Sequence, residues 1–179
     1  MVDSALLARI RIEPLDRKKH DRAAFTCGAS SLDNYLKNTA ARQQHEDMTR
    51  VRVGCLDDSK DVICFHAMNA HALDISSLDE DFRKRFPRYD AIPSIYISMI
   101  GVHSDYQGAG IGSHMMGDAM RQATRAADAI GARFLVLDAL NEKAVKLYRR
   151  LGFQALVSNP ERMIISFETI RLASKKATN

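Results

Sequence analysis

Alternating apolar and polar residues predict strands in the first half of the chain. Residues 9–15 alternate up to Pro14, and residues 49–56 carry valines at alternate positions. A short polar turn separates this second stretch from residues 62–73, so we expect the two to form an antiparallel hairpin. Residues 94–103 are mostly apolar and rich in β-forming residues. This composition predicts a central strand buried on both faces.

Helical spacing of apolar residues predicts two helices between these strands. Leu32, Tyr35, Leu36 and Ala40 share one face of a helix that Ser30 or Ser31 can cap. Residues 76–86 predict a short capped helix, and we expect Pro87 to end it because the residue before a proline disfavours the helical conformation.

The second half of the chain reads as a long helix followed by alternating strands and helices. The long helix ends near Ala129, and its apolar face steps by four and three residues. That face consists of Met116, Met120, Ala123, Ala127 and Ile130, with Gly131 as the C-terminal cap. We expect a strand at 133–140 and a helix at 141–152 that Asn141 caps and Gly152 ends. Strands at 153–156 and 162–170 follow, then a flexible tail at 173–179.

This order of elements predicts a mixed α/β (α+β) sheet in a single domain, residues 1–172. The chain has 179 residues, enough for one domain with a sizeable core. It has neither a secretory signal nor an apolar run that could span a membrane, so we expect a cytoplasmic protein with no membrane contact. Three cysteines without a C-x-x-C pair exclude a zinc ribbon or a redox motif, and we expect no metal.

The charge distribution favours an anionic ligand. The net charge is +4, and residues 101–179 carry 11 basic and 7 acidic side chains. A phosphorylated cofactor or an RNA backbone would suit this excess, although a solvated basic surface explains it as well.

The turn at residues 107–112, Gln-Gly-Ala-Gly-Ile-Gly, lies between a predicted buried strand and the long helix. Alternate glycines let the backbone approach a ligand closely, and the start of a helix favours negative charge. The turn therefore predicts a phosphate site. Ser113 and His114 follow it, which excludes the lysine of a Walker loop, and too few residues remain for a dinucleotide-binding fold. The pyrophosphate of coenzyme A is a phosphate ligand that remains compatible with this turn.

Two segments resemble the signatures of the GNAT superfamily of N-acetyltransferases. Residues 102–112 are similar to its acyl-coenzyme A signature, and residues 141–153, with Asn141, Tyr148 and a Gly-Phe pair, to its second signature. The resemblance implies the GNAT fold, a mostly antiparallel central sheet that is splayed at its middle strands and flanked by helices. It also implies acetyl-CoA as cofactor. The residues implied to bind it are Ile100 and Val102, which pair with pantetheine, the turn residues Gln107, Gly108, Ala109, Gly110, Ile111, Gly112 and Ser113, and Asn141.

A narrower resemblance concerns the GNAT toxins of bacterial toxin–antitoxin modules. It rests on residues 25–28, 32–36, 40–43, 87–89 and 136–139, together with Tyr148. Met99 and His66 stand where that branch usually has an arginine and a tyrosine. The resemblance implies acetylation of the α-amino group of aminoacyl-tRNA and a ribbon–helix–helix antitoxin as partner. The oligomeric state, including a homodimer, stays open.

The resemblance assigns Tyr148 as the catalytic acid that protonates the departing thiolate, although spacing alone favours a core aromatic. It also places the oxyanion against the backbone N–H of Val102. Asp138 is the one acid on the neighbouring strand, and a turn-forming role suits it better than that of a general base. An α-amino group, with a pKa of about 7.7–8.0, is partly neutral at physiological pH and needs no strong base.

Basic residues crowd two predicted helices, where they could receive an RNA backbone or form solvated faces. They are Arg121, Arg125, Lys143, Lys146, Arg149 and Arg150. The sequence therefore leaves three alternative functions open. They are a toxin that acetylates aminoacyl-tRNA, a general GNAT enzyme for a small amine or a protein amine, and a non-catalytic acyl-CoA-binding regulatory module.

Overall fold

The computed structural model describes residues 3–86 and 88–178, with the backbone alone at 177 and 178. The expected mixed α/β class is confirmed. The strands form a mixed sheet in the order β1 (Ile10–Pro14), β2 (Arg50–Leu56), β3 (Val62–Asp74), β4 (Ala91–Val102), β5 (Phe134–Asp138), β7 (Arg162–Ser166) and β6 (Gln154–Ala155). Contacts divide the chain into two compact units. The first unit runs to Asn69 and resumes over Ser98–Ala119, and the second comprises Ala70–Ile97 and the chain from Met120 onward. We describe each unit by itself.

In the first unit, three antiparallel strands confirm the expected hairpin. They are β1 (Ile10–Pro14), β2 (Arg50–Leu56) and β3 (Val62–Asp74), and β3 continues into the second unit. A short helix, α1 (Ser4–Ala8), precedes them. Gly54 lies opposite Cys64, and a Cβ at Gly54 would come within 2.4 Å of the Cys64 sulfur. The strand therefore needs a glycine here for close packing.

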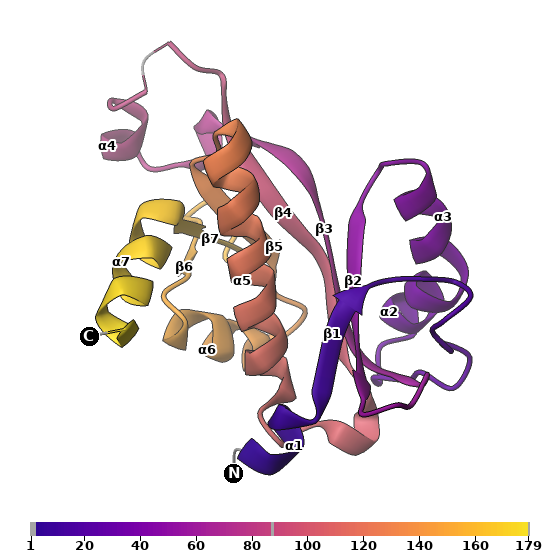
Figure 1. Ribbon diagram of the computed structural model, residues 1–179. Coiled ribbons are helices and arrows are strands. Elements are labelled where there is room, and N and C mark those ends of the chain that lie inside the picture. The colour runs from indigo at the N-terminus through magenta and orange to yellow at the C-terminus, as the bar shows by residue number, and fades with distance from the viewer. Residues whose placement is uncertain (1–2, 87, 179) are drawn as a thin grey trace. The chain divides into compact units, whose positions relative to one another are not determined.

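A helical segment packs beside β2 in the same unit (Figure 1). It consists of α2 (Ser30–Asn34), a π-helical turn η1 (Tyr35–Thr39) and α3 (Ala40–His45). The face predicted from spacing is buried at Leu32, Tyr35, Leu36 and Ala40. The predicted serine cap is wrong, because the cap position is Ala29. Asp33 instead reaches back and accepts a hydrogen bond from the backbone N–H of Cys27 at 2.9 Å, so the acid orders the entry to the helix.

The long helix α5 (Ile111–Ile130) begins in the first unit. Ile111 and Met115 are fully buried there and pack with Ile63, alongside Ile100 and Val102 of β4 (Ala91–Val102). This apolar contact fixes the first turns of α5 against the strands, directly after the glycine turn.

The second unit contains the rest of β4 and the C-terminal strands. β4 pairs in parallel with β5 (Phe134–Asp138) from Ser94 to Ile97, and β5 pairs antiparallel with β7 (Arg162–Ser166). The remaining elements are η2 (Ile75–Ser77), α4 (Glu80–Arg83), α6 (Glu142–Arg150), β6 (Gln154–Ala155) and α7 (Phe167–Thr178). Phe134, Val136 and Ile164 form the centre of its core.

Two expectations for these elements need correction, and a third concerns a residue outside the described part of the chain. Ile130 is 76% exposed, so the apolar face of α5 ends at Ala127. β4 is buried on both faces only in part, since Ser98, Met99 and Ile100 are half-buried. Pro87, predicted to end the helix that is observed as α4, lies outside the described residues.

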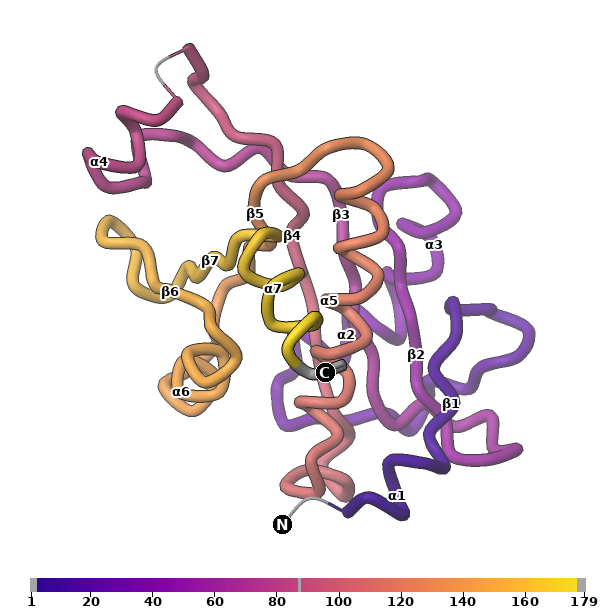
Figure 2. The backbone as a smooth tube through the Cα atoms, turned by 60° about the vertical axis from the view of Figure 1, so that its left-hand side comes forward, coloured from indigo at the N-terminus to yellow at the C-terminus, as the bar shows by residue number. Residues whose placement is uncertain are grey.

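The strand expected at 162–170 is the largest error in the elements. It ends at Ser166, and α7 follows at once (Figure 2). The Ser166 hydroxyl accepts a hydrogen bond from the backbone N–H of Thr169 at 3.1 Å, which caps the new helix. α7 extends to Thr178, and the flexibility expected of residues 173–179 stays a prediction.

Candidate functional site

The glycine turn lies in the first unit, between a 3-10 turn, η3 (Ser104–Tyr106), and the start of α5. Gly108 and Gly110 have φ angles of 84° and 92°, a backbone region that residues with side chains rarely adopt. A Cβ built at Gly108 meets no atom within 4 Å, so the space in front of this backbone is open. The turn therefore has the open, positive-φ backbone that these glycines allow, and its role as a phosphate cradle stays a prediction.

Gln107 holds this turn in place. Its side-chain Nε2 donates hydrogen bonds to the carbonyl oxygens of Cys27 at 2.9 Å and Val102 at 3.0 Å. The backbone N–H of Asp3 donates to the Ala109 carbonyl at 3.1 Å. The amide of Gln107 is thus occupied by the backbone of two other segments, and this anchoring role is one that the sequence did not indicate.

The start of α5 suits an anion. The first N–H groups of a helix lack intrahelical acceptors, and here they belong to Ile111, Gly112 and Ser113. The first turn carries no acidic residue, so nothing there repels a phosphate. Helix start, open glycine backbone and rigid anchor together fit the pyrophosphate of coenzyme A.

The predicted catalytic residue Tyr148 lies on α6 in the second unit. It is 7% exposed, and its ring packs against Phe153 with centroids 5.9 Å apart. Burial raises the pKa of Tyr148 above its ordinary value, so the phenol stays protonated at neutral pH. The core position that the spacing indicates is therefore confirmed, and the role of Tyr148 as catalytic acid stays a prediction.

Asn141 caps α6, a role separate from the cofactor contact that the family resemblance implies. Its side-chain oxygen accepts a hydrogen bond from the backbone N–H of Ala144 at 2.9 Å, which caps the start of α6 as predicted. The residue therefore fixes the helix that carries Tyr148, and its contact with the cofactor stays a prediction.

Asp138 is a paired carboxylate. Arg162 donates two hydrogen bonds to it, each 2.8 Å long, and the Tyr96 hydroxyl donates a third at 2.9 Å. The Arg162 guanidinium is the main reason that the pKa of Asp138 lies below its ordinary value. A carboxylate held in this way is a poor general base. The sequence analysis missed Arg162 and Tyr96, because their proximity to Asp138 follows only from the registers in which β5 pairs with β7 and with β4.

The basic face expected on α6 is exposed. Lys143, Lys146, Arg149 and Arg150 are all open to solvent. Lys146 and Arg149 line a surface hollow of about 560 Å³, together with Asn141 and the acidic residues Glu142 and Glu161. The hollow thus combines cations with hydrogen-bonding groups, and its two carboxylates moderate the charge.

A buried polar cluster of the first unit was also missed. His66 and Asp118 are nearly inaccessible, and Arg52 Nε donates to Asp118 Oδ2 at 2.8 Å. The sequence analysis names His66 only as a departure from the pattern of the GNAT toxins. Within the described residues no cluster of histidine, cysteine and acidic side chains could hold a metal ion, and no helix is long and apolar enough to cross a membrane.

The chain belongs to the GNAT acetyltransferase family. The family described as acetyltransferase (GNAT) matches residues 79–153, which include the glycine turn and Tyr148. The chain is 40% identical to the probable toxin TacT of Sinorhizobium fredii over 178 residues, 96% of this chain and 98% of the relative.

Two solved structures of the toxin AtaT are also similar to this chain. AtaT complexed with acetyl-methionyl-tRNAfMet has a TM-score of 0.83 at 27% identity, over 92% of this chain and 98% of that one. A tyrosine-to-phenylalanine mutant of AtaT, bound to acetyl-CoA and the C-terminus of the antitoxin AtaR, has a TM-score of 0.77 at 25% identity. That comparison covers 92% of this chain and 97% of the other.

Proposed function

We propose that this protein transfers the acetyl group of acetyl-CoA to the α-amino group of aminoacyl-tRNA, and that it acts as the toxin of a toxin–antitoxin pair. The observation that carries this proposal is the 40% identity to the probable toxin TacT over 96% of the chain. The likeness to AtaT, which was solved with an acetylated aminoacyl-tRNA, supports the same substrate class. The rigid glycine turn and the buried, protonated Tyr148 supply the chemistry that the transfer needs.

The turn at 107–113 would hold the pyrophosphate with its backbone N–H groups, and β4 would pair with pantetheine at Ile100 and Val102. Acetyl-CoA supplies an activated acyl group as a thioester. A neutral amine attacks its carbonyl carbon, and the backbone N–H of Val102 stabilises the oxyanion. Tyr148 then donates its proton to the thiolate that leaves, and bulk water restores this proton.

The paired state of Asp138 supports an α-amino substrate over a lysine. A lysine amine, with a pKa of about 10.4, must lose a proton to a base before it can attack. With a lowered pKa, Asp138 is unsuited to that task. An α-amino group is partly neutral near pH 7.4 and can release its proton to water after the attack.

The proposal also includes the RNA contact surface, the antitoxin and the cellular location. The exposed cations of α6 would receive the RNA backbone. A ribbon–helix–helix antitoxin would neutralise the toxin, in line with the AtaT structure that contains the C-terminus of AtaR. Charged tRNA is found where translation takes place, so we expect the protein to act in the cytoplasm.

The decisive test is transfer of radiolabelled acetyl groups to purified, charged tRNA at physiological salt. We expect label on charged tRNA, none on uncharged tRNA, and loss of label when mild base cleaves the ester that joins amino acid to tRNA. Label on a polyamine or a free amino acid, with none on charged tRNA, would instead favour an ordinary small-amine acetyltransferase. An enzyme that binds acetyl-CoA and labels none of these acceptors would contradict the proposal.

A further inference from the structure

A second basic surface lies in the first unit, on segments that carry none of the residues assigned to the reaction. Arg17, Lys18, Arg22, Lys37 and Lys60 line a hollow of about 630 Å³, which we call the N-terminal basic hollow. Arg17, Lys18 and Lys60 are exposed, and Arg22 and Lys37 are half-buried. The sequence analysis did not single out these residues, because they are spread over 44 positions of the chain.

Backbone hydrogen bonds bring the three segments of the hollow together. The N–H of Asp21 donates to the carbonyl of Lys60 at 2.8 Å, which joins the loop after β1 to the turn between β2 and β3. The Arg22 side chain donates to the carbonyl of Leu36 at 3.3 Å and so joins this loop to the π-helical turn η1 that carries Lys37. The cations therefore share a defined surface. π-helical turns occur frequently at functional sites.

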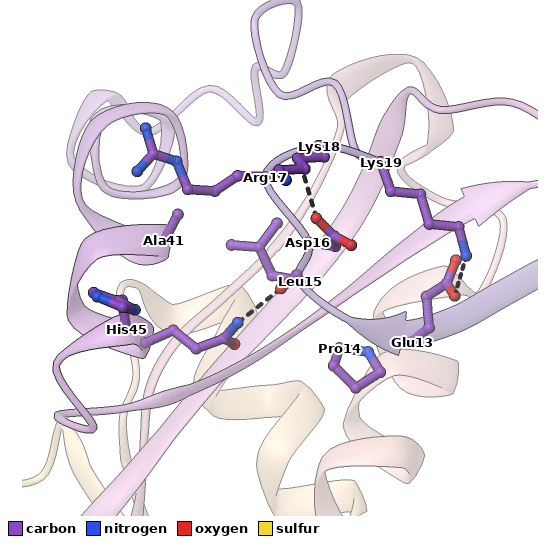
Figure 3. Close-up of a pocket in the computed structure, with 10 residues that line it drawn as sticks. Glu13, Pro14, Leu15, Asp16, Arg17, Lys18, Lys19, Ala41 and His45 are labelled. Atoms are coloured by element: carbon purple, nitrogen blue, oxygen red, sulfur yellow. Dashed lines mark hydrogen bonds and ion pairs between the residues drawn. The ribbon is translucent and has the colours of Figure 1, made fainter.

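The positive charge of the hollow is largely uncompensated. In the part of the chain that the structure describes, none of the five cations named above has a carboxylate within ion-pair distance. Lys19 also lines the hollow, but its ammonium group is paired with Glu13 at 2.5 Å (Figure 3). The nearby carboxylates of Asp16 and Asp21 accept hydrogen bonds from the backbone N–H groups of Lys18 and Ala23, each at 2.8 Å. Both carboxylates keep their charge and are held to the loop, and the five unpaired cations outnumber them.

The lining of the hollow favours a nucleic-acid backbone over a protein. Protein interfaces have apolar and aromatic centres. The described lining includes one apolar residue, Ala23, and its aromatic ring, that of His20, is buried and so not accessible for a base to stack on. Clustered lysine and arginine side chains without stacking partners are typical of phosphate contacts, which orient a nucleic acid without reading its bases.

From this charge and lining we propose that the N-terminal basic hollow binds the sugar-phosphate backbone of tRNA, independently of sequence. The inference rests on the proposed function for the identity of the RNA. It adds a second contact surface to the basic face of α6, in a unit that carries none of the residues proposed for proton transfer. Its role is to hold the tRNA body, so it contributes to affinity and salt dependence while leaving acetyl-CoA binding unchanged.

The test compares tRNA binding by the full-length protein and a double charge reversal, Lys18→Glu with Lys60→Glu. Both side chains are exposed and make no described contact, so the fold should be retained. The matched control reverses Lys175 and Lys176 to Glu, since these exposed lysines on α7 give the same change of net charge. Fluorescence anisotropy with uncharged tRNA, at several salt concentrations, gives Kd and its salt slope without any need for catalysis.

We expect the Lys18/Lys60 reversal to raise Kd at least tenfold and the control to change it less than threefold. Two lost phosphate contacts should reduce the slope of log K against log salt by about 1.4–1.8, at about 0.7–0.9 for each contact. An RNA hairpin of unrelated sequence should respond in the same way, and acetyl-CoA affinity measured by calorimetry should stay unchanged.

Equal Kd and slope in the wild type and the reversal would overturn the proposal. So would an equal loss of affinity in the α7 control, because net charge alone would then explain the effect. If the reversal left RNA binding intact and weakened binding of a co-expressed antitoxin, the hollow would be a protein site and the proposal would be wrong. A wild type that binds tRNA through the hollow but transfers no acetyl group would contradict the proposed function alone.

Discussion

His66 Nε2 and Asp118 Oδ2 lie 2.9 Å apart in the core of the first unit, with Arg52 bound to the same carboxylate oxygen. His66 and Arg52 lower the pKa of Asp118 despite its burial, so the carboxylate is ionised and accepts both hydrogen bonds. His66 must then carry a proton on Nε2. His66 Nδ1 is buried and has no hydrogen-bond partner in the described structure. The cluster ties α5 to β2 and β3.

Asp118→Asn should destabilise the protein by about 3 kcal/mol, because removing one partner of a buried ion pair leaves the other charge uncompensated. Chemical denaturation would measure this loss. Asp128→Asn on the same helix is the matched control, since its pair with Arg171 is exposed and should contribute about 1 kcal/mol or less. Equal effects of the two substitutions would show that the cluster has no special stabilising role.

Acid should destabilise the fold in a defined window through Glu13. The Lys19 ammonium, followed by the Arg11 guanidinium, lowers the pKa of Glu13 from 4.5 to about 2. The stabilisation is complete above the unfolded value and is lost as the pH falls from about 4.5 toward 2. Glu13→Gln should therefore reduce this part of the pH dependence, as measured by the melting temperature across this range. An unchanged profile would mean that the Glu13 pairs do not stabilise the folded state.

Gly110→Asp should weaken acetyl-CoA binding at least tenfold, about 1.4 kcal/mol, because it adds a negative charge to the phosphate cradle. The φ angle of 92° strains any side chain at this position, so Gly110→Asn is the necessary control for backbone and size. Calorimetry should show a larger loss for Asp than for Asn. Equal affinities of two folded variants would exclude a pyrophosphate at this turn.

Tyr148→Phe should reduce turnover about 10²–10⁴-fold, the usual contribution of a general acid. The ring and its contact with Phe153 are kept, so acetyl-CoA affinity and melting temperature should change little. Tyr89→Phe, at a tyrosine that is 56% exposed in the same unit, should leave turnover unchanged. A loss of less than about threefold for Tyr148→Phe would assign this residue to the core alone.

The strands and the major helices could be predicted because their apolar patterns have clear periods. The hairpin of β2 and β3, the buried face shared by α2, η1 and α3, and the glycine that ends α5 were all predicted correctly. The end of β7 could not be predicted, since residues 162–170 are rich in β-forming residues on both sides of Ser166. The hydroxyl of Ser166, directly before α7, accepts a hydrogen bond from the backbone N–H of Thr169. The sequence pattern does not reveal this contact.

The candidate site was predictable where it depends on local sequence. The glycine turn and the Asn141 cap are set by neighbouring residues, and both have the predicted form. The hydrogen-bond partners of Asp138 and Gln107 could not be predicted, because Arg162 and Cys27 lie 24 and 80 residues away along the chain. Such pairs follow from strand register and loop packing, and neither leaves a periodic pattern in the sequence.

The two hydrogen bonds of the Gln107 amide bear on the kinetics of cofactor capture. A loop that is free in the unliganded protein must lose conformational entropy when its ligand arrives, which lowers affinity and slows association. In this protein the loop is ordered by its own chain. Acetyl-CoA should therefore associate in a single concentration-dependent phase, with no slower rearrangement after the encounter.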